Sequence, residues 1–288
     1  MRFLVLLLLL SSCNVTKMLT SGETEVGDKF FGDNSGTQVN CTLNPTHSDC
    51  CDTSDSRGPC YSPDTSSLSA DLVAFWRLEE SANSTRFDTH INSYSLLDTG
   101  GNVGQNTSGN IGHAADCSTG SSGSHLLQGN ITLNRSISED LTFSFWADMG
   151  ADVSGGCGDT NYVIDFNTYF IMFDNDDCEN DNSDLVITWP SGTYAFRDVV
   201  DFDDGSYHHF IVLIKAGGGS VELYVDGTLF NTIAGTPSSF SHASSFGLCS
   251  DSAGAQTFGG SLDSVGIWTK ALSSNEIFWL YNGYGSLN

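Results

Sequence analysis

The carboxylates that could carry out acid–base chemistry are paired unfavourably for polysaccharide hydrolysis. Two adjacent pairs occur, Glu79-Glu80 and Glu139-Asp140. Retaining hydrolysis requires two carboxyl groups on one face, whereas neighbouring residues of a strand point to opposite faces. The sequence also contains no G-x-S-x-G elbow, zinc-protease helix or phosphate-binding loop. We therefore expect a protein that is not an enzyme, with a polysaccharide-degrading enzyme as the alternative.

Three aromatic side chains offer a different chemistry, which is stacking against sugar rings. Residues 141–148 alternate between apolar and polar side chains, and Trp146 projects from the polar face. Trp189 and Tyr194 flank a Pro-Ser-Gly turn. An exposed ring at any of these positions would be a stacking platform for a ligand. The alternative is that the opposite sheet or a loop covers each ring.

The elements that would position such residues are clearest near the C-terminal end, beginning with a hairpin. Residues 210–214 are an apolar run, and residues 221–225 alternate up to Asp226-Gly227. Asp-Gly is a strong signal for a type I′ turn, because both central residues need positive φ. Residues 228–232 are therefore expected to return antiparallel.

A short helix is predicted after this hairpin. Ser273 and Glu276 have the spacing of a capping box, in which each side chain accepts a hydrogen bond from the backbone amide of the other residue. Ile277, Leu280 and Tyr281 then share one helical face. The many short alternating segments before this helix, broken by Gly, Asn, Asp and Ser, are typical of a sandwich or barrel.

These blocks resemble the laminin-G-like group of the concanavalin A-like jelly rolls. The matching segments are His208-His209 and residues 223–227, 260–268 and 271–281, preceded by an opening strand at 72–80. The resemblance covers about residues 70–285 and implies an all-β fold, a two-sheet antiparallel β-sandwich (jelly roll) with one short C-terminal helix. In the group's pattern the histidine pair belongs to a strand, with one ring buried. Metal binding or general-base chemistry by this pair is the alternative.

The same resemblance implies a structural calcium ion where the first and last strands meet. Carried over by position, its ligands are Glu79, Asp88 and Asp263. Asp263 is open to a second interpretation, in which it caps a turn or binds a neighbouring amide. The acidic run at 174–184 is another candidate, because calcium takes roughly six to eight oxygen ligands. It lacks the EF-hand spacing, and a solvated hairpin loop is the alternative.

The charge balance excludes whole classes of partner. The 288 residues include 35 acidic and 10 basic ones, for a net charge of −25. So acidic a surface has few basic side chains that could displace the counterions of a phosphate backbone, and nucleic acid is therefore excluded as a partner. Adsorption to anionic membranes is excluded for the same reason. A glycan or glycoprotein remains as the expected partner.

The N-terminal residues indicate the compartment. Residues 1–12 carry one positive charge and an apolar run too short to span a bilayer, and are interpreted as an export signal. Residues 10–13 also resemble a bacterial lipobox, in which Cys13 is lipidated; an ordinary secretory signal is the alternative. We expect a secreted protein, or one anchored at the cell surface or outer membrane, without membrane insertion of the mature domain. Polar residues 13–70 are predicted to be a tether with a disulfide cluster, followed by the jelly-roll domain at 71–288.

The cysteine count agrees with export. Nine cysteines leave eight once Cys13 is set aside, and eight can all pair in an oxidising compartment. The tether contains a C-x₈-C-C-x₈-C cluster, interpreted as a disulfide knot with a zinc site as the alternative: Cys41, Cys50, Cys51 and Cys60. Cys157 and Cys178 flank candidate strands and form the natural pair. Cys117 with Cys249 then follows by elimination.

Jelly rolls host enzymes, lectins and adhesion modules, so the fold does not by itself decide the function. Without paired carboxylates, the features above predict a non-catalytic extracellular recognition module that binds a glycan or glycoprotein, with calcium assisting. The alternative is a protein–protein adhesion module or a structural component of a virion or envelope surface.

Overall fold

The computed structural model of the chain divides into two compact units, Met1–Asp64 and Thr65–Asn288. The structure describes four short strands of the first unit, and in the second unit residues 65–118, 126–136, 138–149, 160–167, 169–174, 182–189, 191–201, 205–216, 219–235, 238–254 and 256–282. Several predicted features lie outside the described residues: the export signal at 1–12, Cys13, the cluster Cys41, Cys50, Cys51 and Cys60, the pair Cys157 and Cys178, and most of the acidic run at 174–184.

The first unit contains two small antiparallel pairs of strands. β1 (Lys17–Met18) pairs with β2 (Thr24–Glu25), and β3 (Phe30–Gly32) pairs with β4 (Gln38–Asn40). The predicted tether at 13–70 spans these strands.

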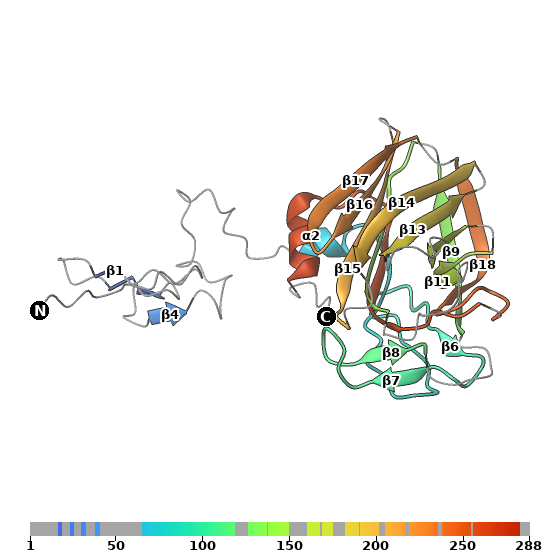
Figure 1. The fold of residues 1–288 in the computed structure, drawn as a ribbon, viewed down its shortest axis with the longest axis horizontal. Helices are drawn as coiled ribbons and strands as arrows, with labels where there is room; N and C mark the ends of the chain where they lie inside the picture. The colour runs from blue at the N-terminus through green and yellow to red at the C-terminus, as the bar shows by residue number, and fades with distance from the viewer. Residues whose placement is uncertain are drawn as a thin grey trace, which may run out of the picture. The chain divides into compact units, whose positions relative to one another are not determined.

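The second unit is a sandwich of two antiparallel sheets (Figure 1). The first sheet has the order β17 (Thr228–Ala234), β16 (Ser220–Val225), β15 (His208–Lys215), β10 (Leu141–Asp148), β19 (Ser261–Trp268), β8 (Ala114–Asp116) and β7 (Gly104–Asn106), with β5 (Leu72–Trp76) also paired to β19. The second has the order β14 (Gly192–Asp201), β13 (Asn182–Trp189), β12 (Phe170–Asp174), β11 (Thr160–Asp165), β18 (Phe240–Leu248), β9 (Leu127–Arg135) and β6 (Leu97–Asp98). The predicted fold class is thereby confirmed.

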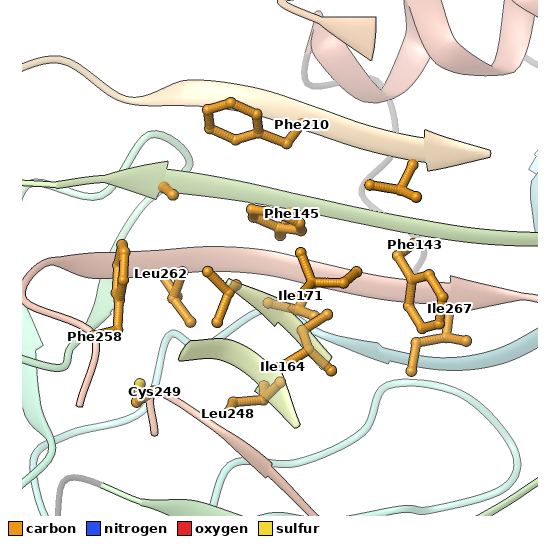
Figure 2. Packing of buried hydrophobic residues seen from close by; sticks show 14 of the residues in the cluster. Phe143, Phe145, Ile164, Ile171, Phe210, Leu248, Cys249, Phe258, Leu262 and Ile267 are labelled. Carbon is orange, nitrogen blue, oxygen red and sulfur yellow. The ribbon is translucent and has the colours of Figure 1, made fainter. Parts of the chain in front are cut away.

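The main core lies between the inner faces of the two sheets, as Figure 2 shows for side chains contributed by both. β9 alternates between buried and more exposed residues along its length, as expected for a strand with one face against the core. Three rings meet at the centre: Phe210 lies 5.4 Å from Phe145 and 5.2 Å from Phe173, between ring centroids. Such aromatic pairs contribute about 1 kcal/mol beyond the area they bury.

A second, smaller core covers part of the outer face of the first sheet. α2 (Ser274–Tyr281) places Ile277 and Leu280 against Ile211 and Leu213 of β15. Its predicted capping box is present, with Glu276 Oε2 accepting from the Ser273 amide at 2.7 Å. Burial on both sides explains why β15 and β19 have continuously buried residues and no clear alternation.

One helix was predicted, whereas the described residues contain two. α1 (Thr65–Ser69) belongs to the second unit, which therefore begins before the expected start at residue 71. Leu68 is fully buried, and its carbonyl accepts a 2.7 Å hydrogen bond from the indole nitrogen of Trp268. Five residues with one apolar side chain carry no helical pattern, so only this tertiary packing identifies α1.

A disulfide joins Cys117, which follows β8 in the first sheet, to Cys249, which follows β18 in the second. This is the pairing expected by elimination, and it connects the two layers covalently. Within the described part of the chain, the helices fall short of the length and apolar character that crossing a membrane requires.

Candidate functional site

A hollow of about 450 Å³ opens on the outer side of the first sheet, where α2 ends. It is lined by Asn110, Ile111, Trp146, Tyr207, His208, Asp226, Tyr281 and Asn282. β10, the start of β15, the turn between β16 and β17, the end of α2 and the loop between β7 and β8 all contribute to it. We call this hollow the α2 pocket.

One wall of the α2 pocket is formed by Trp146 and Tyr281, which pack with the buried His209 as three nearly parallel rings. Trp146 and His209 are partners in the register of β10 and β15, so their side chains lie on the same outer face, 4.7 Å apart between ring centroids. Tyr281 lies nearly parallel to both, with its centroid 5.6 Å from Trp146. Tyr281 keeps 36% of its surface exposed, whereas Trp146 keeps 5%. Of these three rings, Tyr281 therefore has the most exposed surface.

The hairpin turn supplies the acidic group of the pocket. Asp226 and Gly227 have φ of 49° and 74°, as a type I′ turn requires. A Cβ at residue 227 would lie 3.1 Å from the Tyr281 ring, so glycine also lets the helix end approach the turn.

Asp226 is held ionised by its neighbours. Its Oδ2 lies 2.8 Å from His208 Nδ1, and its Oδ1 accepts from the His209 amide at 2.9 Å. Burial opposes ionisation, but these two hydrogen bonds outweigh it and keep the pKa of Asp226 below its ordinary value.

Two titratable rings beside Asp226, those of His209 and Tyr207, stay neutral. Burial lowers the pKa of His209 to about 3, with Asp226 partly opposing the shift, and His209 Nε2 lies 2.9 Å from Ser144 Oγ. Burial also raises the pKa of Tyr207 to about 12. Its hydroxyl accepts from Asn106 Nδ2 at 3.2 Å. His209 is thus the buried, hydrogen-bonded ring that the family resemblance implies.

Two predicted metal ligands, Glu79 and Asp263, instead hold the loop that carries Asn110 and Ile111. Asp263 Oδ2 accepts from the Ile111 amide at 2.8 Å, and Glu79 Oε2 accepts from the His113 amide at 2.8 Å. Asp263 has no exposed surface, and this burial, with Glu79 nearby, raises its pKa to about 6.

The third predicted metal ligand, Asp88, holds a different loop. Its carboxylate accepts from the amides of Phe75 at 2.9 Å, His90 at 2.8 Å and Tyr94 at 3.0 Å. Among the described residues, no three His, Cys, Asp or Glu side chains are arranged to hold a metal ion. The structure thus places Glu79 and Asp263 at one loop and Asp88 at another, and a calcium site formed by the three stays a prediction.

The predicted stacking residues are not brought together. Trp189 is 3% exposed, packs against Tyr169 in the second sheet, and donates from its indole nitrogen to the Ser238 carbonyl at 2.6 Å. Tyr194 lies half-buried at the edge of the main core. Only Trp146 of the three lines the α2 pocket.

Sequence reasoning overlooked Asn110, Tyr207 and Asn282, and it assigned Asp226 and Tyr281 only to a turn and a helix face. These residues could have been found from the expected positions of the elements that carry them. A hairpin turn after the histidine strand and the end of the capped helix both reach the outer face of β10, where Trp146 was expected to project.

Comparison with known proteins supports the fold. The family model described as concanavalin A-like lectin/glucanases superfamily matches residues 120–278. No curated protein matches the chain in sequence.

Solved structures with similar folds include two toxin domains and one enzyme module. The binding domain of Paraclostridial Mosquitocidal Protein 1 has a TM-score of 0.54 and 16% identity over 75% of this chain and 53% of its own. The botulinum neurotoxin serotype D ligand binding domain, in complex with N-acetylneuraminic acid, has a TM-score of 0.55 and 15% identity over 76% and 52%. Domain 4 of AbnA, a GH43 extracellular arabinanase from Geobacillus stearothermophilus, in complex with arabinotriose, has a TM-score of 0.50 and 19% identity over 73% and 98%. The chain thus spans about half the length of the toxin domains, and at such identities the likeness shows the fold alone.

Proposed function

The chain belongs to the concanavalin A-like lectin/glucanases superfamily, and from that premise we propose that its second unit is a non-catalytic module that binds a glycan, free or on a glycoprotein, in the α2 pocket. The observation that carries this proposal is the combination of the exposed Tyr281 ring with the ionised Asp226 in one open hollow.

Sugars present two kinds of surface, and the α2 pocket has a partner for each. The apolar face of a pyranose packs against an aromatic ring, and the hydroxyls require hydrogen-bond acceptors and donors. Tyr281 offers the ring, braced from behind by Trp146. Asp226 offers accepting oxygens, and the exposed amides of Asn110 and Asn282 offer both kinds of group.

The relatives support this assignment. Two of the similar structures are complexes with sugars, one with N-acetylneuraminic acid and one with arabinotriose. The described lining contributes one carboxylate, Asp226, whereas glycoside hydrolysis ordinarily uses two. A single carboxylate favours binding over catalysis.

An extracellular setting is part of the proposal. The Cys117–Cys249 disulfide suits an oxidising compartment. The predicted export signal at 1–12 agrees with this, and lipidation of Cys13 would add an anchor at the surface.

The test is a glycan array probed with the labelled full chain, in buffers with calcium and with chelator. We expect a defined group of glycans to bind, and Tyr281→Ala to weaken that binding by about tenfold, which is about 1.4 kcal/mol. Phe278→Ala is the matched control, because Phe278 is 56% exposed on the same helix but does not line the pocket. Equal losses in both variants would contradict binding in the α2 pocket. No binding to any glycan would favour the alternative of a protein–protein adhesion module.

A further inference from the structure

We propose that the α2 pocket selects uncharged sugars and discriminates against sugars that carry a carboxylate, such as sialic and uronic acids. This inference rests on the proposed glycan-binding function and narrows its ligand class.

The lining of the α2 pocket carries no net positive charge. Asp226 is the only acidic residue and His208 the only histidine among the described residues that line the pocket. They already bind one another, with His208 Nδ1 and Asp226 Oδ2 2.8 Å apart. The net charge of this pair is zero when the imidazole is protonated and −1 when it is neutral. A carboxylate on the ligand would therefore meet no net positive charge.

The lysines and arginines of the second unit lie away from the α2 pocket. All lysines and arginines of residues 65–288 lie in the described part, and none of them lines the pocket: Arg77, Arg86, Arg135, Arg197, Lys215 and Lys270. Proteins usually recognise carboxylates through such groups, above all through the arginine fork. An acidic sugar would lack this partner here.

Most of these cations are also engaged elsewhere. Arg197 pairs with Asp184 at 2.8 Å, Lys215 with Glu222 at 2.7 Å, and Lys270 with Glu276 at 2.6 Å. Arg86 is buried and donates to the carbonyls of Ser81, Ser84 and Gly104. Moving one of them to a bound carboxylate would break these contacts.

The orientation of α2 also disfavours a bound anion. The helix meets the pocket with its C-terminal end, at Tyr281 and the cap residue Asn282. Unpaired carbonyls give this end of a helix a partial negative charge, which disfavours anions. The chain's net charge of −25 acts in the same direction at long range.

A hydroxyl, by contrast, fits each of these features. It donates to Asp226, which only accepts, and it needs no counter-charge. The selectivity therefore follows from what the lining contains, whereas the similar toxin domain was solved in complex with an acidic sugar, N-acetylneuraminic acid.

The test uses the full chain on an array of matched pairs, with each neutral glycan printed beside its sialylated or uronic-acid counterpart. We expect the neutral member of each bound pair to bind about tenfold more tightly or better. Equal or tighter binding of the acidic members would overturn the inference while leaving glycan binding intact. Binding to no member would overturn the proposed function together with it.

Two variants with the same charge change locate the source of the selectivity. Asp226→Asn keeps an oxygen for the His209 amide, and Asn tolerates the left-handed backbone of residue 226. We expect this variant to reduce the ratio of the affinity for the neutral glycan to the affinity for its acidic counterpart by about threefold or more. Asp71→Asn is the control, because Asp71 also has a positive φ, of 61°, is exposed and does not line the pocket. An equal narrowing in both variants would show that net charge alone sets the ratio, and would contradict selection by the pocket.

Discussion

Asp263 is a buried carboxylate that holds a loop of the α2 pocket without lining the pocket itself. Its carboxylate holds the Ile111 amide, and Ile111 lines the α2 pocket. The family resemblance assigned Asp263 to calcium, with binding of a neighbouring amide as the alternative, and the structure shows Asp263 accepting a hydrogen bond from the Ile111 amide. Trp146 was placed on the outer face correctly by alternation, whereas its cover, Tyr281, comes from a distant helix that no local pattern connects to it.

The raised pKa of Asp263 predicts a pH dependence of stability. Since burial raises the pKa to about 6 in the folded state, the native chain binds this proton more tightly than the unfolded chain. The stabilising effect is complete below about pH 4 and is lost as the pH rises through about 6. Asp263→Asn should therefore raise the free energy of unfolding at pH 8 by on the order of 1–3 kcal/mol, measured by urea titration.

The same titrations between pH 4 and 8 should show a shallower pH dependence in Asp263→Asn than in the wild type or in the surface control Asp71→Asn. If Asp263→Asn instead lowers stability at pH 8, and only with calcium present, the carboxylate is a calcium ligand and the amide-binding account is wrong.

At the scale of elements, α2 connects a local sequence signal to the site. Ser273 and Glu276 are three residues apart, so the capping box could be predicted without knowledge of the fold. α1 could not be predicted in this way, because its single apolar residue is held by Trp268, far along the chain. The hairpin turn was predictable for the same reason as the cap, because the local sequence Asp226-Gly227 determines the backbone geometry of the turn.

Removing the cap tests whether α2 positions the pocket. Ser273→Ala should lower the free energy of unfolding by about 1 kcal/mol, since the Glu276 amide loses its acceptor. It should also weaken glycan binding, because Tyr281 and Asn282 lie at the other end of the helix. Ser274→Ala, at an exposed neighbouring position, is the control for both chemical denaturation and binding. If Ser273→Ala lowers the free energy of unfolding by the expected amount but leaves the affinity for the glycan unchanged, α2 does not position the pocket.

Glu276 of the capping box makes the stability of the fold depend on pH in the acidic range. Burial would raise the pKa of Glu276, but hydrogen bonds from Lys270 and Ser273 outweigh it and lower that pKa. The resulting stabilisation is present above the ordinary glutamate pKa and is lost as the pH falls through the lowered value. We expect Glu276→Gln to reduce stability at pH 7 and to have a smaller effect at strongly acidic pH, as followed by thermal unfolding.

At the scale of the whole molecule, the disulfide closes the sandwich. Cys117 and Cys249 are 132 residues apart, and they follow strands that belong to different sheets. Their pairing could be proposed from the cysteine count, but the sequence could not show that it connects the layers. The pocket is likewise a whole-molecule feature, since a loop, two strands, a turn and a helix end converge on it from across residues 110–282.

Replacing both cysteines by alanine should lower the free energy of unfolding by about 4–5 kcal/mol, because so long a loop costs much chain entropy to close. Urea denaturation of the wild type with and without a reductant measures this loss. The double variant should lack the part of the reductant effect that comes from breaking this disulfide. A loss below about 1 kcal/mol would mean that packing alone holds the sheets together.

The most direct test of the central claim is the crystal structure of the chain with the glycan that binds most tightly on the array. The account predicts a sugar ring packed against Tyr281, with a hydroxyl within hydrogen-bond distance of the Asp226 carboxylate. A sugar bound elsewhere, for example beside Tyr194 on the second sheet, would contradict it.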